Sequence, residues 1–190
     1  MLFRSRAAQE AAQRFGVGST ASSVAAGNHT LHRKLEQDIA AYYGAEEAII
    51  FSTGFMANLG VISALVREGD TLFIDAHCHA SIFNACRSSS TRVYQFRHND
   101  PADLARLFVE SRASGFNSVV VVEGVYSVWG DVGDLKGIVD VAKRHGAVVV
   151  VDEAHAMGMY GEKGRGVAEL HDVENDVDIV VGTFSKSVGA

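Results

Sequence analysis

Two short apolar runs that do not alternate with polar residues constrain the fold of this chain most. The segments Val119 to Glu123 and Ala147 to Asp152 are each unbroken in apolar residues until they end on an acid. Strands of this kind are buried on both faces, as in a parallel sheet that is covered by helices. The intervening segment Leu135 to His145 is predicted to be a helix, so the two strands are expected to be parallel, with a right-handed crossover.

The rest of the chain repeats this alternation of strands and helices. Asp100 and Pro101 have the residue types of a helix N-cap and first helical position, so a helix is expected to start there. Gly44 supplies a C-terminal stop for the helix before it. Further strands are predicted at 48–51, 71–75, 92–96 and 179–182, and further helices at 6–15, 31–43, 54–65 and 81–86. The expected fold class is α/β, with a mostly parallel sheet and helices on both faces.

Length and composition limit the classes of protein to consider. The chain has 190 residues, of which 47% are hydrophobic and 21% charged, as expected of a globular domain with a real core. A net charge of −6 does not favour nucleic acid or an anionic membrane, so no nucleic-acid partner is expected. No apolar run is long enough for a transmembrane segment, and Met1 to Glu10 has no signal core. Two cysteines cannot form a disulfide framework, which predicts a reducing, cytoplasmic location.

Polar residues follow four of the predicted strands at the point where each strand ends. In a parallel sheet these ends share one edge, where ligands bind and where helix N-termini favour a phosphate. The four groups, in chain order, are Asp75 with His79; Glu123 with Ser127 and Asp131; Asp152 with His155; and Thr183 with Ser185 and Lys186. The sequence therefore predicts that acids, hydroxyls, two histidines and a lysine meet at one edge.

This set of side chains suits pyridoxal 5′-phosphate (PLP). PLP needs an amine for its aldehyde, an acid for its ring nitrogen, donors for its phosphate and a group packed on its ring. Lys186 is the candidate amine, held as a Schiff base, and Asp152 at a buried strand end is the candidate acid. Thr183, Ser185 and the turn Ser52 to Gly54 suit the phosphate, and His79 or His155 could cover the ring or bond its phenolic oxygen.

The same residues also permit two other interpretations, an ATPase motif and a metal site. Asp152 to His155 after four valines also resembles the acidic box of a helicase-type ATPase, but the chain has no Gly-x-x-x-x-Gly-Lys-Ser/Thr loop upstream. His77, Cys78 and His79, with Cys86 or Asp75, could be read as a metal site. His77 and His79 would face opposite sides of an extended segment, and no second ligand pair follows. No metal is expected.

Several motifs follow one another along the chain. They are Phe51-Ser-Thr-Gly-Phe-Met-Ala-Asn58, Asp75 with His79-Ala-Ser81, Phe96-Arg-His-Asn-Asp100, Glu123-Gly-Val-Tyr-Ser127 with Gly130-Asp131, Val151-Asp-Glu-Ala-His155, Gly164-Arg-Gly-Val167 and Gly182-Thr-Phe-Ser-Lys186. In these motifs the chain resembles the α-oxoamine synthases, a branch of the fold-type I PLP enzymes. Within the family it looks most similar to the serine palmitoyltransferases.

The resemblance implies a role for each candidate site residue. It implies that Lys186 forms the Schiff base and moves the substrate's α-proton, and that His79 stacks on the ring and contacts substrate. Asp152 would pair with the pyridine nitrogen, and His155 and Ser127 would lie near the phenolic oxygen. The phosphate would be held by the amides of Gly54 and Phe55 and the hydroxyls of Thr183 and Ser185.

The implied reaction is the condensation of an amino acid with an acyl-CoA, followed by decarboxylation to an α-amino ketone, as in sphingolipid or biotin-type biosynthesis. Trp129 and Ser23 depart from the residues that relatives place there, which leaves both substrates open. Another fold-type I PLP enzyme, such as an aminotransferase or a lyase, is the alternative, as is a truncated, non-catalytic partner subunit.

The resemblance also implies an organisation for the chain. Residues 1–47 would be an N-terminal helical segment, and residues 48–190 a PLP-binding large domain that is incomplete at its C-terminus. The small C-terminal domain of the family would be absent, so the resemblance implies an incomplete chain that is inactive by itself. A homodimer with the site at its interface is expected.

Overall fold

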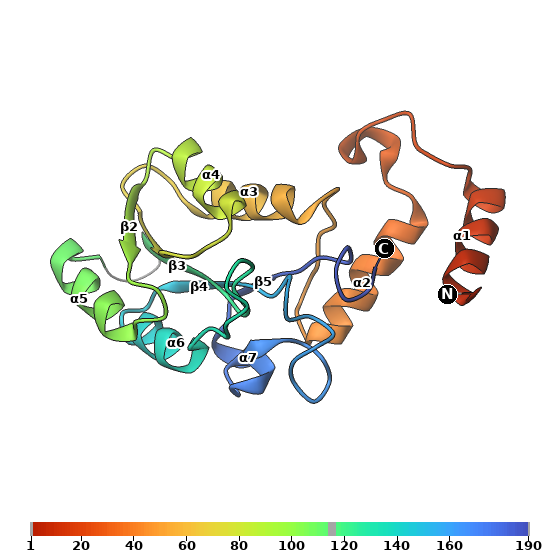
Figure 1. Ribbon diagram of the computed structural model, residues 1–190. Helices are drawn as coiled ribbons and strands as arrows, with labels where there is room; N and C mark the ends of the chain where they lie inside the picture. The colour runs from red at the N-terminus through yellow and green to blue at the C-terminus, as the bar shows by residue number, and fades with distance from the viewer. Residues whose placement is uncertain (1, 114–116, 190) are drawn as a thin grey trace. The chain divides into compact units, whose positions relative to one another are not determined.

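A computed structural model describes residues 2–113 and 117–189. The chain divides into two compact units, Met1–Ile50 and Phe51–Ala190. The first unit is helical and the second contains the sheet (Figure 1). The elements of the chain, in order, are α1 (Leu2–Phe15), the π-helix η1 (Ser23–Gly27), α2 (Thr30–Tyr43), α3 (Gly54–Leu65), β1 (Thr71–Asp75), α4 (Ala80–Ser88), β2 (Arg92–Phe96), α5 (Pro101–Ser111), β3 (Ser118–Glu123), α6 (Leu135–Arg144), β4 (Val148–Asp152), α7 (Val167–Leu170), the 3-10 helix η3 (Glu174–Asp176) and β5 (Ile179–Val181).

The sheet is parallel throughout, in the order β2-β1-β3-β4-β5, which confirms the predicted α/β class. Helices α3 and α4 cover one face, and α5, α6 and α7 cover the other (Figure 1). Every residue of β1 and β3 is buried, as the unbroken apolar runs predict for strands between two helical layers. The register places Glu123 of β3 opposite Asp152 of β4, so two acids end neighbouring strands.

Alternate residues of the central strands enter two separate cores. Phe73, Val120 and Val149 pack with the apolar side chains of α5 and α6. On the other face, Val121 and Val150 pack with those of α3 and α4. Burying this apolar surface on both sides stabilises the sheet and fixes its carboxyl edge, from which the polar side chains project.

Most predicted boundaries hold, because local chemistry and burial agree there. The Asp100 carboxylate accepts a hydrogen bond from the Asp103 amide at 2.9 Å, and α5 begins at Pro101, as predicted. Gly44 ends α2 in the left-handed conformation, with φ of 70°. Helix α7 was not predicted; it is a single turn that follows the glycine-rich loop ending at Gly166.

The strand predicted at 48–51 is wrong. Those residues form an irregular segment with no strand pairing. Ile49 is 75% exposed, and the Ile50 amide donates to the Glu36 carboxylate at 3.2 Å. Four consecutive apolar residues suggested a strand, but the segment does not pair with the sheet, and a side chain accepts the hydrogen bond of the Ile50 amide.

The helices in the described parts of the chain all fall short of the length and apolarity that crossing a bilayer requires.

Candidate active site

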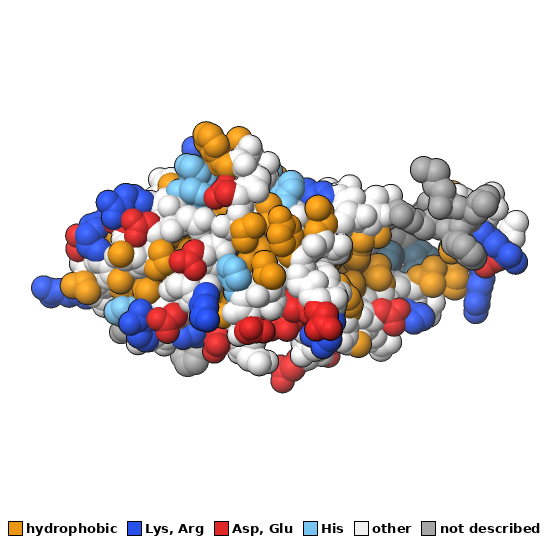
Figure 2. Space-filling view, turned by 60° about the horizontal axis from the view of Figure 1, so that its bottom comes forward, with side chains coloured by type: hydrophobic (Ala, Val, Ile, Leu, Met, Phe, Trp, Pro, Cys, Tyr) orange, Lys and Arg blue, Asp and Glu red, His pale blue; other side chains and the backbone are white. Residues whose placement is uncertain are grey.

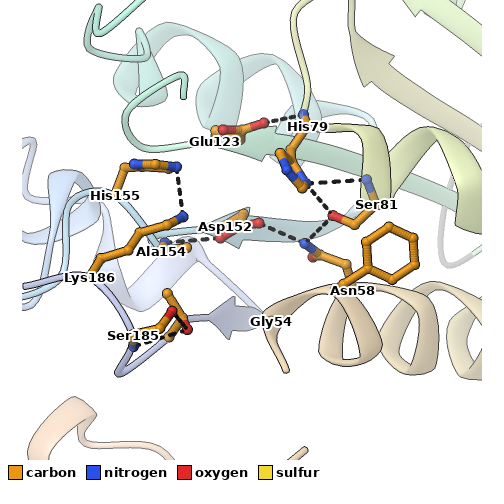
Figure 3. Close-up of a pocket in the computed structure, with 12 residues that line it drawn as sticks. Gly54, Asn58, His79, Ser81, Glu123, Asp152, Ala154, His155, Ser185 and Lys186 are labelled. Atoms are coloured by element: carbon orange, nitrogen blue, oxygen red, sulfur yellow. Dashed lines mark hydrogen bonds between the residues drawn. The ribbon is translucent and has the colours of Figure 1, made fainter. Parts of the chain in front are cut away.

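A cavity of about 210 Å³ lies at the carboxyl edge of the sheet, within the second unit (Figure 3). Its walls come from the N-terminal turns of α3 and α4, from the ends of β3 and β4 and from the turn after β5. The lining residues are Gly54, Phe55, Asn58, His79, Ser81, Glu123, Asp152, Ala154, His155, Thr183, Ser185 and Lys186. All the residues to which the resemblance gives a role line it except Ser127.

Asp152 is the buried acid of this cavity. It ends β4 and is 6% exposed. One carboxylate oxygen accepts from Asn58 Nδ2 at 2.7 Å, and the other accepts from the Ala154 amide at 2.9 Å. Both donors are neutral, so these bonds orient the carboxylate without cancelling its charge. A buried carboxylate in this situation is stabilised by a cationic or N–H partner from a ligand.

Lys186 follows β5 and faces the same cavity. Its Nζ lies 2.6 Å from His155 Nε2, so one of these two nitrogens accepts a hydrogen bond from the other (Figure 3). Burial lowers the pKa of Lys186, although Asp152 and Glu123 oppose this shift. Burial also lowers the pKa of His155, and the Lys186 charge lowers it further. Both shifts are toward the uncharged forms of the side chains, and the uncharged amine is the form that attacks an aldehyde.

Hydroxyls and a helix N-terminus form another side of the cavity. Thr183 Oγ1 and Ser185 Oγ lie 2.9 Å apart. Helix α3 starts beside them, since a Cβ on Gly54 would lie 3.6 Å from Thr183 Cβ. Thr53 caps that helix by accepting from the Met56 amide at 3.1 Å. The amides of the first helical residues have no partner within the helix, and with the helix dipole they suit a phosphate.

His79 and Glu123 meet at the wall formed by α4 and β3. The His79 amide donates to the Glu123 carboxylate, and the His79 ring caps α4 by accepting from the Ser81 amide at 3.2 Å. Burial raises the pKa of Glu123 to about 7, and the neighbouring charge of Asp152 adds to that effect. Ser127 stands in the turn beyond β3, where its backbone amide bonds Glu123. Ser127 does not line the cavity, and the contact found for it in the described residues is this backbone hydrogen bond to Glu123.

The sequence predicts no role for Asn58, and for Glu123 it predicts only a place at this edge of the sheet. Asn58 is 3% exposed and Glu123 is 2% exposed, and both line the cavity. A lone amide four residues after the start of a strongly apolar helix was a usable signal for Asn58, because a buried amide needs partners. No such signal exists for the contact with Asp152, which is 94 residues away.

A second polar cluster lies beside the cavity, around His98. Its two ring nitrogens contact Asp75 Oδ1 at 2.8 Å and Asp131 Oδ2 at 2.6 Å. The His77 ring stacks on His98, with 3.9 Å between ring centroids, and Trp129 stacks on His77 at 5.1 Å. Asp75 and Asp131 therefore anchor His98. Asp75 contributes to this cluster and does not line the cavity.

The histidine pair considered as a metal site separates in the structure. His77 joins the ring stack, whereas His79 lines the cavity. Cys78 is buried between them, and its thiol contacts the Val121 carbonyl oxygen at 3.6 Å.

A parallel sheet that brings a lysine, a buried aspartate and a helix N-terminus to one cavity defines the large α/β domain of fold-type I PLP enzymes. The chain belongs to the aminotransferase class I and II family, whose model matches residues 3–190.

Individual proteins with known names give more specific similarities than the family model. The chain is 48% identical to a serine palmitoyltransferase of Caulobacter vibrioides, covering 97% of this chain and 46% of that protein. It is 42% identical to an 8-amino-7-oxononanoate synthase of Geobacter sulfurreducens, covering 97% and 47%. A variant of serine palmitoyltransferase from Sphingomonas paucimobilis, solved with a bound PLP–myriocin aldimine, superposes with a TM-score of 0.92 at 45% identity, covering 97% of this chain and 46% of that one.

Both enzyme names belong to the α-oxoamine synthases, so the resemblance seen in the sequence is confirmed. The chain spans about half the length of the curated relatives it matches.

Proposed function

We propose that this chain binds PLP through Lys186 and forms the cofactor domain of an enzyme that condenses an amino acid with an acyl-CoA. One observation carries the proposal. A single cavity is lined by the Lys186 amine, the Asp152 carboxylate and the hydroxyl and amide groups near Gly54 that suit a phosphate. The relatives named as serine palmitoyltransferase and 8-amino-7-oxononanoate synthase support the same class of reaction.

The chemistry of the donor set fits PLP. The Asp152 carboxylate is held by neutral donors only, which leaves its charge available for a protonated ring nitrogen. The Thr183 and Ser185 hydroxyls and the amides of Gly54 and Phe55 would hold the phosphate. His79 would cover the ring, and His155, with Ser127 farther away, would lie toward the phenolic oxygen. We propose these roles for the individual residues.

Bound PLP supplies an electron sink that stabilises a carbanion at the amino acid's α-carbon. Lys186 is the proposed base for the α-proton, because its amine is already shifted toward the neutral form. The contact of Lys186 Nζ with His155 Nε2 holds that amine at the cavity. His79 is the second proposed catalytic residue, since it lines the cavity opposite Lys186 and can contact the substrate (Figure 3).

Residues 48–190 would be the PLP-binding large domain, and residues 1–47 its N-terminal helical segment. A homodimer and a cytoplasmic location complete the proposal. Exposed apolar side chains near the sheet edge, including Val128 at 81% and Trp129 at 66%, support an interface between copies. Figure 2 shows apolar side chains at the surface of one face, between acidic and basic ones. The two cysteines are free thiols, in keeping with a reducing compartment.

The cofactor claim is tested by adding PLP to the chain and recording the absorbance spectrum. A Schiff-base band near the visible edge is expected, and Lys186→Ala should abolish it. Lys136→Ala, an exposed lysine of α6, is the matched control and should leave the band unchanged. A band that survives Lys186→Ala would contradict the assignment.

The reaction is tested by thiol release from acyl-CoAs of different length, each with a panel of amino acids. Release of CoA that depends on both substrates supports an α-oxoamine synthase. A PLP band without CoA release would favour the alternatives: an aminotransferase, a lyase or a non-catalytic partner.

A further inference from the structure

A buried chain of hydrogen bonds connects the two walls of the cavity. Asn58 Nδ2 donates to Asp152 Oδ2 at 2.7 Å and to Ser81 Oγ at 3.0 Å. Ser81 Oγ in turn lies 2.8 Å from Nδ1 of His79. Asn58 is 3% exposed and Ser81 is 1% exposed, so water does not compete for these bonds. Figure 3 shows these hydrogen bonds, which run from Asp152 through Asn58 and Ser81 to His79.

The direction of each hydrogen bond follows from Asp152. A carboxylate only accepts, so the Asn58 amide must turn its NH2 group toward it; the flipped amide would bring its oxygen against the carboxylate. The same NH2 group then donates its second hydrogen to Ser81 Oγ. Since Ser81 Oγ receives that hydrogen, its own hydrogen is available for the next acceptor, the His79 ring.

The His79 ring receives two donors at the same nitrogen. Besides the Ser81 hydroxyl, the Ser81 amide donates to His79 Nδ1 at 3.2 Å. An imidazole nitrogen that accepts these hydrogens carries none itself. In the neutral His79 ring the proton therefore resides on Nε2. Because His79 lines the cavity, this nitrogen can act there as an N–H donor.

We infer that Asn58 and Ser81 are positioning residues that orient the Asp152 carboxylate and fix His79 in the tautomer protonated on Nε2. The inference rests on the proposed function for its consequence: one network would set both the acid proposed to pair with the PLP ring nitrogen and the histidine proposed to cover the ring. His79 would then act toward a ligand as a hydrogen-bond donor through Nε2. Neither Asn58 nor Ser81 needs to contact the substrate.

The tautomer is measured without PLP, by long-range proton–nitrogen correlation spectra of the chain labelled with 15N-histidine. His79→Gln identifies the His79 signals. We expect an unprotonated Nδ1 and a protonated Nε2 in the unmodified chain, with Ser81→Ala and Asn58→Ala shifting the ring toward a mixture of tautomers. A proton on Nδ1, or the same mixture before and after Ser81→Ala, would overturn the inference. The unmodified chain alone decides the first point, even if a variant fails to fold.

Two exposed residues of α4 provide matched controls, Asn84→Ala for Asn58 and Ser88→Ala for Ser81. Both should leave the His79 spectrum unchanged. With PLP added, Asn58→Ala should weaken binding about tenfold while keeping the Lys186-dependent band, because one charged hydrogen bond to Asp152 is lost. Unchanged affinity would contradict the link to Asp152. If the unmodified chain gave no band but the expected tautomer, the proposed function would fail and the positioning network would stand.

Discussion

Nζ of Lys186 and Nε2 of His155 lie 2.6 Å apart, on segments that follow neighbouring strands of the sheet. Two cations at this distance would repel each other, and a hydrogen bond needs one of the nitrogens to be an acceptor. The contact therefore couples the protonation of the two side chains, and it brings an amine and an imidazole to the cavity in forms suited to proton transfer.

Removing the Lys186 amine should change the titration of His155. Burial is the larger cause of the lowered pKa of His155 and the Lys186 charge the next, so Lys186→Met should raise that pKa only part of the way back toward 6.5. NMR titration of labelled histidines measures it. A His155 that titrates at or above 6.5 in the unmodified chain would contradict the structure.

Lys186 itself should react as a neutral amine at lower pH than an ordinary lysine. Its pKa is lowered from 10.5 by burial, whereas Lys136 is exposed on α6 and has no such environment. Competitive acetylation at graded pH, followed by mass spectrometry of the two peptides, compares them within one sample. Identical pH profiles for both lysines would show that the cavity does not tune Lys186.

Replacing Asp152 should separate cofactor binding from folding. Asp152→Asn removes a charged partner for the ring nitrogen, so PLP affinity should fall by about 2 kcal/mol, or roughly 30-fold. The free energy of unfolding without PLP should change little or rise, since a buried charge held by neutral donors is removed. Urea unfolding and PLP titration measure the two quantities. Equal loss of stability and of affinity would indicate a purely structural aspartate.

Stability should fall as pH rises through the window set by Glu123. Its pKa in the folded chain is about 7, against an ordinary value of 4.5. Between these values the folded state holds a proton that the unfolded state has lost, so its contribution is present below 4.5 and lost by pH 7. Glu123→Gln should remove that loss, a gain on the order of 2–3 kcal/mol at pH 8 and little at pH 4.5. Urea unfolding at the two pH values measures it.

Glu153 provides a matched control for this prediction. Burial raises its pKa to about 7 as well, but it bonds the Ala168 amide and does not line the cavity. Glu153→Gln should show the same dependence of stability on pH. Only Glu123→Gln should also lower the pKa of Lys186, because the Glu123 charge raises it. A change in the pKa of Lys186 with Glu153→Gln, or no change with Glu123→Gln, would refute the separation of the two acids.

The His98 cluster should contribute stability mainly at low pH. Burial alone would lower the pKa of His98, but its bonds to Asp75 and Asp131 outweigh that effect and raise it above 6.5. Its contribution is therefore complete below 6.5 and is lost as pH rises through the raised value. His98→Asn should cost about 2 kcal/mol at pH 6 and less at pH 9. A cost that does not vary with pH would show that His98 is not charged by the two carboxylates.

Much of the fold could be predicted because burial and local chemistry coincide in the central strands. Val119 to Glu123 and Ala147 to Asp152 are apolar on both faces, and no arrangement but an interior strand satisfies them. The segment 48–51 is also apolar, but no neighbouring residue in the sequence tells whether Ile49 is exposed or buried. Strand pairing depends on partners elsewhere in the chain.

The candidate site, too, could be predicted only in part. Lys186, Asp152 and His155 follow strand ends, so the topology of a parallel sheet brings them to one edge. The Asn58 amide and the Ser81 hydroxyl lie within helices α3 and α4, and their partners become apparent only when those helices pack on the sheet. Ser127 shows the converse, since it follows a strand end and yet does not line the cavity.

The central claim is that Lys186 binds PLP, and trapping the adduct tests it most directly. The chain is incubated with PLP, reduced with borohydride, digested and mapped by mass spectrometry. The account predicts a phosphopyridoxyl group on Lys186, at a PLP concentration that leaves Lys136 unmodified. Modification spread over exposed lysines, with Lys186 no more labelled than Lys136, would contradict it.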